Sequence, residues 1–347
     1  MRTALVTGAT GFVGGHVAAD LLAHGWRVRA LVRTQSMGSG RLPEGCEPAA
    51  GDLRDADAVE RAARDVDAVF HVAARYSLAR HRAAEVFHTN VAGTSNILRA
   101  AARAGAPVVH TSSVATVGLR GDGGVGDEDT PQPPSQVIGA YKRSKVESER
   151  LALAAAAEGR HVVVVNPTAP VGPGDHAPTP TGRIVADFLA GRMPAYVDTG
   201  LNLVDVRDVA AGHRLALERG VPGRRYILGN ENMTLREILA ALAAIAGRRA
   251  PRVRLPHAVA IAVAALDETI EGRMLRREPL APLDGALMAR KRMFVDGSRA
   301  VRELGMPQSP VGNALADAVE WFRGGRRGDD GPSTSAALPA AGSRRPR

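Results

Sequence analysis

Tyr141 and Lys145 lie four residues apart in the stretch YKRSKV, which predicts a helix running to about Ala157. Side chains at positions i and i+4 share one face of a helix. A free phenol, with a pKa of about 10, is a poor base at neutral pH, and a nearby ammonium group stabilises the phenolate and lowers that pKa. We therefore expect Tyr141 to transfer a proton and Lys145 to tune it, although a surface pair would show the same spacing.

Two hydroxyl groups precede this helix. The segment PVVHT (107–111) predicts a buried strand that leads directly into Ser112 and Ser113. Open α/β sheets bind ligands at the carboxyl ends of their strands, so the serines are expected to face a ligand crevice. Neither serine lies in the nucleophile-elbow pattern of hydrolases, and no metal is implied by the spacing of the ten histidines or by the single cysteine. The residues favour proton transfer without a metal ion.

A glycine-rich turn near the start of the chain predicts where a cofactor binds. The apolar run Ala4–Val6 predicts a buried strand, and apolar residues after the glycines recur at helical spacing. In such a strand–turn–helix unit the first glycine allows the tight turn, the second lets a backbone N–H approach a pyrophosphate, and the third lets helix and strand pack closely. The expected dinucleotide contacts in this turn are Gly8, Thr10, Gly11, Phe12, Val13 and Gly14.

Arg33 bears on the choice between the two nicotinamide dinucleotides. The stretch Trp26–Val32 predicts the second strand, and Arg33 follows it about twenty residues after the glycines. An acid at this distance binds the ribose 2′-OH of NAD, whereas an arginine accommodates the 2′-phosphate of NADP. NADP is therefore favoured over NAD, although a solvated arginine at a strand end would look the same.

The stretch Asp67–Ala74 predicts the fourth strand, with small residues at its carboxyl end. Small side chains are needed where the nicotinamide half of a dinucleotide crosses the sheet, so Ala73 and Ala74 are expected to line that crossing. His71 lies inside the apolar run and is expected to be a packed core residue rather than a ligand.

The GxxGxxG spacing, together with the tyrosine–lysine pair, resembles the extended branch of the short-chain dehydrogenase/reductase superfamily, the NAD-dependent epimerase/dehydratase type. The resemblance covers about residues 1–322. It implies an α/β fold: a Rossmann-type doubly wound parallel sheet with a smaller, interleaved C-terminal substrate lobe. We expect a dinucleotide-binding domain over 1–170, a lobe over 171–322 whose strands near 203–206 and 225–229 can return to the main sheet, and a disordered basic tail over 323–347.

The same resemblance implies roles for further residues. Asp52 and Leu53 match an acid–hydrophobe pair that contacts adenine, although Asp52 could equally be a loop or cap residue. Asn90 matches an asparagine that braces the active-site strand, and Ser113 matches the substrate-facing hydroxyl. The turn that begins at Asn166 and Pro167 matches one that wraps the nicotinamide end.

The run PTPTGRIVADFLAGRMPAYVDTGLNLVDV (178–206) resembles the hopanoid-associated sugar epimerase subfamily, also described as dihydroflavonol-reductase-like. Arg183 within it is a candidate anion contact, or else a surface arginine. The chain departs from its relatives at Val117, where many have tyrosine, at Arg75, where an acid is expected, and at Asp205–Asp208, where relatives commonly have His-Val-Asp-Asp. We expect Asp208 to cap the helix that follows.

Three functions remain open at this point. The first is a sugar epimerase of hopanoid-associated metabolism, which leaves its cofactor unchanged overall. The second is an NADPH-dependent ketone reductase of the dihydroflavonol 4-reductase or hydroxysteroid dehydrogenase type, which Arg33 favours. The third is a non-catalytic dinucleotide sensor, which would tend to lack the tyrosine–lysine pair. We expect a small-molecule substrate: a sugar, a sugar-linked lipid or a ketone.

Composition limits the other partners. The formal net charge is +9, but its excess is spread along the chain and its tail, and aromatic residues make up only 3% of the 347 residues. A dispersed positive charge with few aromatic residues does not suit nucleic-acid binding.

The apolar run 258–266 is too short to span a bilayer. It is expected to be a buried lobe helix, with shallow membrane docking as the alternative. A single cysteine, Cys46, and an N-terminus that starts with a strand favour the cytoplasm; a homodimer is left open.

Overall fold

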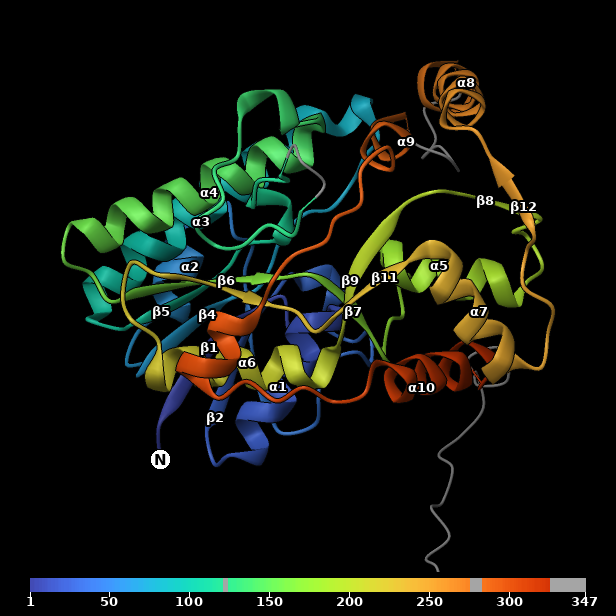
Figure 1. Ribbon diagram of the computed structural model, residues 1–347. Helices are drawn as coiled ribbons and strands as arrows, with labels where there is room; N and C mark the ends of the chain where they lie inside the picture. The colour runs from blue at the N-terminus through green and yellow to red at the C-terminus, as the bar shows by residue number, and fades with distance from the viewer. Residues whose placement is uncertain (121–123, 275–282, 325–347) are drawn as a thin grey trace, which may run out of the picture.

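A seven-stranded parallel sheet forms the centre of the molecule (Figure 1). The computed structural model describes residues 1–120, 124–274 and 283–324. Every neighbouring pair of strands in this sheet is parallel. The strands, in spatial order, are β10 (Arg225–Leu228), β6 (Val162–Pro167), β5 (Val108–Thr111), β4 (Ala68–His71), β1 (Thr3–Thr7), β2 (Arg27–Val32) and β3 (Cys46–Ala50). This order, with helices on both faces, confirms the predicted doubly wound Rossmann-type fold.

Helices cover both faces of the sheet, which is why the central strands are continuous apolar runs. Successive residues of a strand point to opposite faces, so Ala4 and Val6 pack into one core and Leu5 into the other. The first core is closed by α1 (Phe12–Ala23) and α6 (Val206–Arg219). The second is closed by α2 (Ala56–Ala62), α3 (Ala83–Ala104) and α4 (Gly139–Ala157) (Figure 1).

The fourth strand ends three residues earlier than predicted. β4 stops at His71, and the chain then leaves the sheet to lie against the glycine turn. There the Ala73 backbone N–H donates to Thr7 Oγ1 at 3.1 Å. The predicted strand over 67–74 was therefore too long, because its last residues bond to a side chain of the neighbouring strand instead of continuing the ladder.

A third apolar core holds the smaller lobe together. The lobe contains the sheet β11 (Glu231–Thr234), β9 (Gly200–Asp205) and β7 (Ala169–Val171), and the pair β12 (Val253–Leu255) and β8 (Ala195–Val197). Its helices are α5 (Pro180–Leu189), α7 (Leu235–Ala246) and α10 (Val311–Gly324), and α7 opens with a capping box between Thr234 and Glu237. Of the two strands considered for return to the main sheet, β10 joins it beside β6, whereas β9 stays in the lobe sheet.

Helix α8 (His257–Asp267) does not match its prediction. Only Ala264 is buried, and Val259, Val263 and Leu266 are 46%, 56% and 63% exposed. In Figure 1 the helix stands at the periphery, with α9 (Leu283–Met288) beside it. The expectation of a buried lobe helix was wrong, because few elements pack against this helix to cover its apolar face. No helix of the described residues is long and apolar enough to cross a membrane.

Two sequence predictions concern residues that lie partly outside the described ranges. Residues 121–135 are rich in glycine, proline and acidic residues, which predicts a surface loop. The structure describes this segment from residue 124, and Gly126 within it bridges to Val295. The basic tail predicted over 323–347 lies outside the described residues from 325 onward.

Close packing of α1 on β1 gives a testable prediction at Gly14. A Cβ placed there would lie 2.2 Å from the Gly8 carbonyl oxygen, a backbone atom that cannot move aside. Gly14→Ala should lower the free energy of unfolding by about 1–3 kcal/mol, measured by urea denaturation. The matched control is Gly312→Ala, near the start of α10, where nothing lies within 4 Å of the added atom. Equal stability of the Gly14 variant and wild type would contradict this packing.

Candidate active site

Lys145 is anchored at the carboxyl end of β5. Its side chain is buried, and its Nζ donates to the Thr111 carbonyl oxygen at 2.7 Å. Burial lowers the Lys145 pKa to about 8, with the nearby Glu149 carboxylate acting in the opposite direction. The ammonium group is thus held against the strand end from which the serine pair continues.

Tyr141 and Ser113 meet above this strand end. The Ser113 hydroxyl accepts from the Ala115 backbone N–H at 3.1 Å, which caps the short turn Val114–Thr116. Burial raises the Tyr141 pKa above its ordinary value, and the nearby Ser113 side chain partly offsets this. The sequence predicts that Lys145 lowers the Tyr141 pKa, and this prediction is wrong. The pKa is raised because burial disfavours the phenolate, and Lys145 is not among the groups that shift it.

Asn90 shapes the segment that faces the tyrosine. Its side chain accepts from the Arg75 backbone N–H at 2.7 Å, donates to the Arg75 carbonyl at 3.0 Å and donates to Ser144 Oγ at 2.8 Å. These bonds tie the chain after β4 to helix α4, which carries Tyr141 and Lys145. The next residue, Tyr76, places its ring edge-on to the Tyr141 ring, with 4.6 Å between the centroids. Tyr76 was not singled out from the sequence.

The glycine turn fits a dinucleotide pyrophosphate. Gly8 has φ +78°, and a Cβ there would lie 2.9 Å from the Ala73 backbone. Helix α1 begins after Gly11, which offers no side-chain cap, so N–H groups of the first turn remain available. Phosphates are favoured at such a helix N-terminus. Thr10, Phe12 and Val13 are half-buried around this turn, and Gly11 is exposed.

Arg33, Asp52 and Leu53 lie at the other end of the expected cofactor site. Arg33 is exposed directly after β2. The Asp52 pKa is lowered mainly by the hydrogen bond from Arg54, and to a smaller extent by the positive charge of Arg33. The Asp52 carboxylate accepts from the Arg54 Nε and Nη2 atoms, both at 2.9 Å. Leu53 packs against Gly93 of α3. The arginine and the acid thus share one edge of the sheet, where an adenosine would lie.

The remaining predicted residues are more scattered. Pro167 is the last residue of β6 and is buried. Ala74 is exposed after β4, and Arg183 is exposed in the first turn of α5.

Asp208 does not cap α6 as expected. The cap is Asp205, which accepts from the Arg207 backbone N–H, whereas Asp208 binds the Ser309 N–H and hydroxyl at 2.6 and 2.8 Å.

His71 is the packed core histidine that the sequence indicated. Its two ring nitrogens bond to the Thr7 and Thr94 hydroxyls at 2.9 and 3.1 Å. Burial lowers its pKa to about 3, so the ring is neutral at physiological pH. Within the described residues, no group of three or more His, Cys, Asp or Glu side chains is arranged to hold a metal ion.

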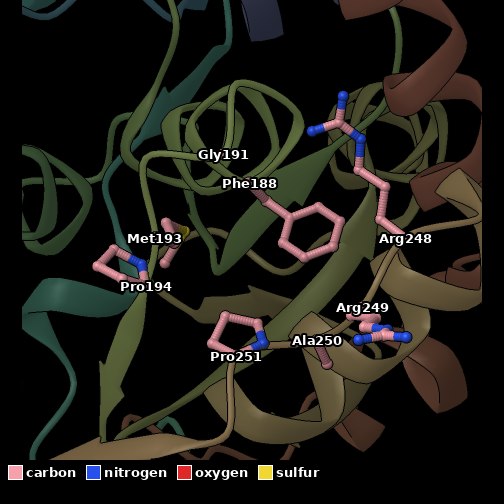
Figure 2. Close-up of a pocket in the computed structure, with 8 residues that line it drawn as sticks. All are labelled: Phe188, Gly191, Met193, Pro194, Arg248, Arg249, Ala250 and Pro251. Atoms are coloured by element: carbon pink, nitrogen blue, oxygen red, sulfur yellow. The ribbon is translucent and has the colours of Figure 1, made fainter.

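Two cavities could admit a substrate. One, of about 440 Å³, lies in the lobe between the end of α5 and the segment after α7, and includes Phe188, Arg248 and Arg249 (Figure 2). The other, of about 400 Å³, is bounded by Ser77 and by the first turn of α4. That turn carries Tyr141, so the second cavity lies beside the tyrosine, although Tyr141, Ser113 and Lys145 are not among its lining residues. The first shares no lining residue with the catalytic helix.

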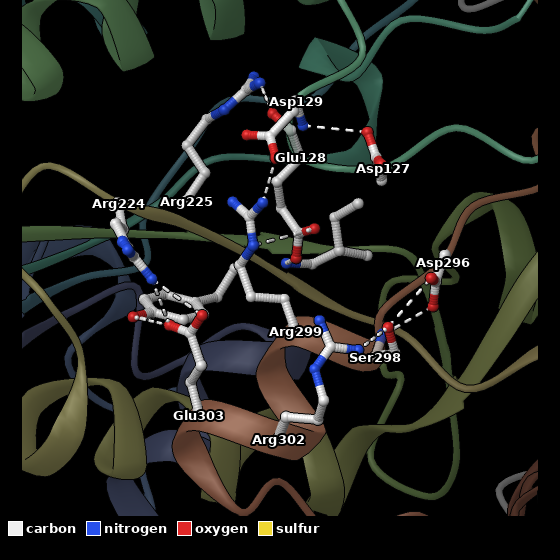
Figure 3. A network of polar contacts seen from close by, with 12 residues as sticks. Asp127, Glu128, Asp129, Arg224, Arg225, Asp296, Ser298, Arg299, Arg302 and Glu303 are labelled. Carbon is white, nitrogen blue, oxygen red and sulfur yellow. Dashed lines mark hydrogen bonds and ion pairs between the residues drawn. The ribbon is translucent and has the colours of Figure 1, made fainter.

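Sequence reasoning missed a buried polar group behind Ser113. Glu149, Thr116 and Asn166 lie on α4, the Val114–Thr116 turn and β6, and they bond to one another. Arg225 links Glu149 to the Glu128 backbone carbonyl, and a wider network of ion pairs continues from there (Figure 3). The only local signal was the i, i+4 spacing of Glu149 from Lys145, since the other partners are distant in sequence.

A doubly wound parallel sheet whose first helix opens on a glycine turn defines a Rossmann-type dinucleotide-binding protein. Comparisons with known proteins specify the family. The model of the NAD dependent epimerase/dehydratase family matches residues 4–229, and the chain belongs to this family, within the extended short-chain dehydrogenases/reductases. It is therefore an NAD(P)-dependent enzyme, and its cofactor is a nicotinamide dinucleotide.

Individual relatives match over nearly the whole chain. A Synechocystis protein described as "Putative dihydroflavonol 4-reductase" is 47% identical over 92% of this chain and 94% of its own length. Sterol demethylase protein B of Methylococcus capsulatus is 38% identical, over 92% and 98% of the two chains. The crystal structure of gox2253 is 44% identical, covers 94% of this chain and 99% of that chain, and has a TM-score of 0.83.

Proposed function

We propose that this enzyme transfers a hydride at a hydroxyl or ketone carbon, with Tyr141, Ser113 and Lys145 as its catalytic residues. The observation that carries the proposal is that the Ser113 side chain acts on the buried Tyr141 phenol, one helical turn from a buried lysine that is anchored at the same strand end. The nicotinamide dinucleotide, when bound, supplies or accepts the hydride. The protein's own residues have to orient the substrate oxygen and move its proton.

Each residue has a distinct task in this proposal. Because burial raises the Tyr141 pKa, the phenol is protonated at neutral pH and can donate to a ketone oxygen. Ser113 hydrogen-bonds the same oxygen and holds it beside the phenol. Lys145, with a pKa lowered to about 8, is mostly protonated at neutral pH and supplies a positive charge that stabilises the phenolate left after proton transfer. The reverse sequence oxidises an alcohol.

The substrate we favour is an apolar ketone or alcohol, which corresponds to the reductase alternative. The cavity at the first turn of α4 is lined largely by apolar residues, with Arg80, Arg143 and Asp284 as its charged groups; the apolar members are Leu78, Ala79, Ala83, Val137, Ile138, Ala140 and Leu287. Val117 replaces a tyrosine found in many relatives and is buried in an apolar cluster. Similarity to a sterol-modifying protein supports the same substrate class.

A sugar epimerase of hopanoid-associated metabolism is the second candidate. The run 178–206 resembles that subfamily, and the family to which the chain belongs includes epimerases. The two functions differ in their cofactor balance. A reductase consumes NADPH in proportion to product, which is followed by absorbance, whereas an epimerase forms product with no net change in the cofactor.

Removing the Tyr141 hydroxyl tests the proposed proton transfer. Tyr141→Phe keeps the ring beside Tyr76 but removes the proton donor, so kcat should fall by about 100- to 10,000-fold. Cofactor affinity, measured by calorimetry, should change little. Activity within a few-fold of wild type in this variant would rule out Tyr141 as the catalytic acid.

Arg33 tests the proposed preference for NADP. A charge-assisted bond to the 2′-phosphate contributes about 1.5–3 kcal/mol, so Arg33→Ser should weaken NADP(H) binding roughly 10- to 100-fold and leave NAD(H) binding unchanged. Calorimetric titration with both cofactors measures this. The control is Arg61→Ser, an exposed arginine on α2. An equal loss for both cofactors would argue against recognition of the 2′-phosphate.

A further inference from the structure

Glu149 is a buried carboxylate on the same face of α4 as the proposed catalytic pair. It follows Tyr141 and Lys145 at intervals of four residues and is only 5% exposed. A carboxylate so far from water is costly unless opposite charge and hydrogen-bond donors surround it. Its surroundings therefore show what this charge does in the fold.

Three donors from three different elements converge on Glu149. Thr116 Oγ1 and Asn166 Nδ2 both lie 2.7 Å from its Oε2 atom. Arg225 Nη1 donates to Oε1 at 3.1 Å from β10, at the edge of the sheet. The carboxylate therefore joins α4 to the turn after β5, to β6 and to β10.

The same two groups also lie beside the backbone of Ser113. Thr116 Oγ1 is 2.8 Å and Asn166 Nδ2 is 3.2 Å from the Ser113 carbonyl oxygen. The single Thr116 hydroxyl proton is donated either to the carboxylate or to this carbonyl, whereas the two N–H groups of Asn166 can reach both. Without Glu149, both groups lose their shared acceptor. The position of the Ser113 hydroxyl relative to Tyr141 thus depends on a carboxylate that does not touch the expected substrate.

We propose that Glu149 is a positioning residue for the reaction, which fixes the Ser113 turn and serves as the buried counter-charge of Lys145. This inference rests on the proposed function for its catalytic meaning, but its electrostatic part concerns the protein alone. Arg225 forms an ion pair with Glu149, so its guanidinium competes with Lys145 for the same negative charge.

Other titratable groups around Lys145 have to be considered. His71 on β4 and His110 on β5 are buried, and their pKa values are lowered by burial and by neighbouring positive charge. Both rings are therefore neutral wherever Lys145 titrates. His213 on α6 bonds the Thr111 hydroxyl and is also neutral there, because burial lowers its pKa to about 4. Glu149 is left as the principal group that favours the charged form of Lys145.

The small number of lysines makes this measurable without an activity assay. The chain has three, Lys142, Lys145 and Lys291. With ¹³C at lysine Cε, NMR spectra of the full chain give three signals, and Lys145→Arg identifies one of them. In wild type the Lys145 signal should titrate with a midpoint of about 8, since burial lowers its pKa to that value.

Two variants should shift that midpoint in opposite directions. Glu149→Gln removes the counter-charge and should lower the Lys145 midpoint by roughly 1 pH unit or more. Arg225→Met removes the competing cation and should raise it. Glu147→Gln, which removes a carboxylate that pairs with Arg150 on the same helix, should leave it unchanged. An unmoved midpoint in a folded Glu149→Gln protein, or in Arg225→Met if the former does not fold, overturns the inference.

Kinetics then separate this inference from the proposed function. In an active enzyme the alkaline limb of kcat/KM should move to lower pH in Glu149→Gln by the same amount as the Lys145 midpoint. A purely structural role would lower activity at every pH without moving the limb, and that result would overturn the inference. Absence of turnover by the wild type with NADPH and any ketone or alcohol would count against the proposed function, while the lysine titration would still decide the role of Glu149.

Discussion

A buried ammonium group has to keep hydrogen-bond partners, and the Lys145 ammonium finds one in the Thr111 carbonyl at the carboxyl end of β5. This contact ties α4 to the end of β5, and the apolar core that α4 shares with α3 and the sheet holds the helix in place. It brings Tyr141, one turn earlier, over the residues that continue β5, so the phenol meets Ser113. The strand end is also held from the other face, where His213 of α6 bonds the Thr111 hydroxyl at 2.9 Å.

The loop after Ser113 is fixed by the edge of the sheet. β10 is an edge strand, and the Ile227 N–H on it donates to the Glu128 carboxylate at 2.8 Å. Arg225 donates to the Glu128 backbone carbonyl, and Arg299 forms an ion pair with the Glu128 carboxylate (Figure 3). An edge strand otherwise presents free N–H groups for pairing with other chains. Here the Ile227 N–H binds Glu128, which lies in the loop that leads toward Tyr141. The same bond therefore occupies a free N–H of the edge strand and anchors a loop beside the candidate site.

Local sequence patterns predicted the parts of the site that local geometry determines. The glycine turn, the i, i+4 spacing of Tyr141 and Lys145, and the helix that carries this pair and ends at Ala157 needed only short-range rules. Glu149, Thr116 and Asn166 could not be found in this way, because a buried carboxylate looks like any helical glutamate until its distant donors are in place. The same limit explains α8, whose apolar run predicted burial while few elements cover it.

The direction of the Tyr141 pKa shift was also beyond sequence reasoning. Spacing places an ammonium near the phenol, but only the fold shows that this ammonium donates to Thr111 and that burial is the larger effect. A protonated phenol at neutral pH suits donation to a ketone. The same burial, together with the apolar lining of the adjacent cavity, favours a water-poor site for the reaction.

The most direct measurement is a crystal structure of the full chain with NADP⁺ and a steroid ketone as an apolar probe. The account predicts that the ketone oxygen lies about 2.6–3.2 Å from both the Tyr141 and Ser113 hydroxyls, with the nicotinamide ring against the same carbonyl carbon. A ketone oxygen out of reach of both hydroxyls, with the probe bound elsewhere, would contradict it.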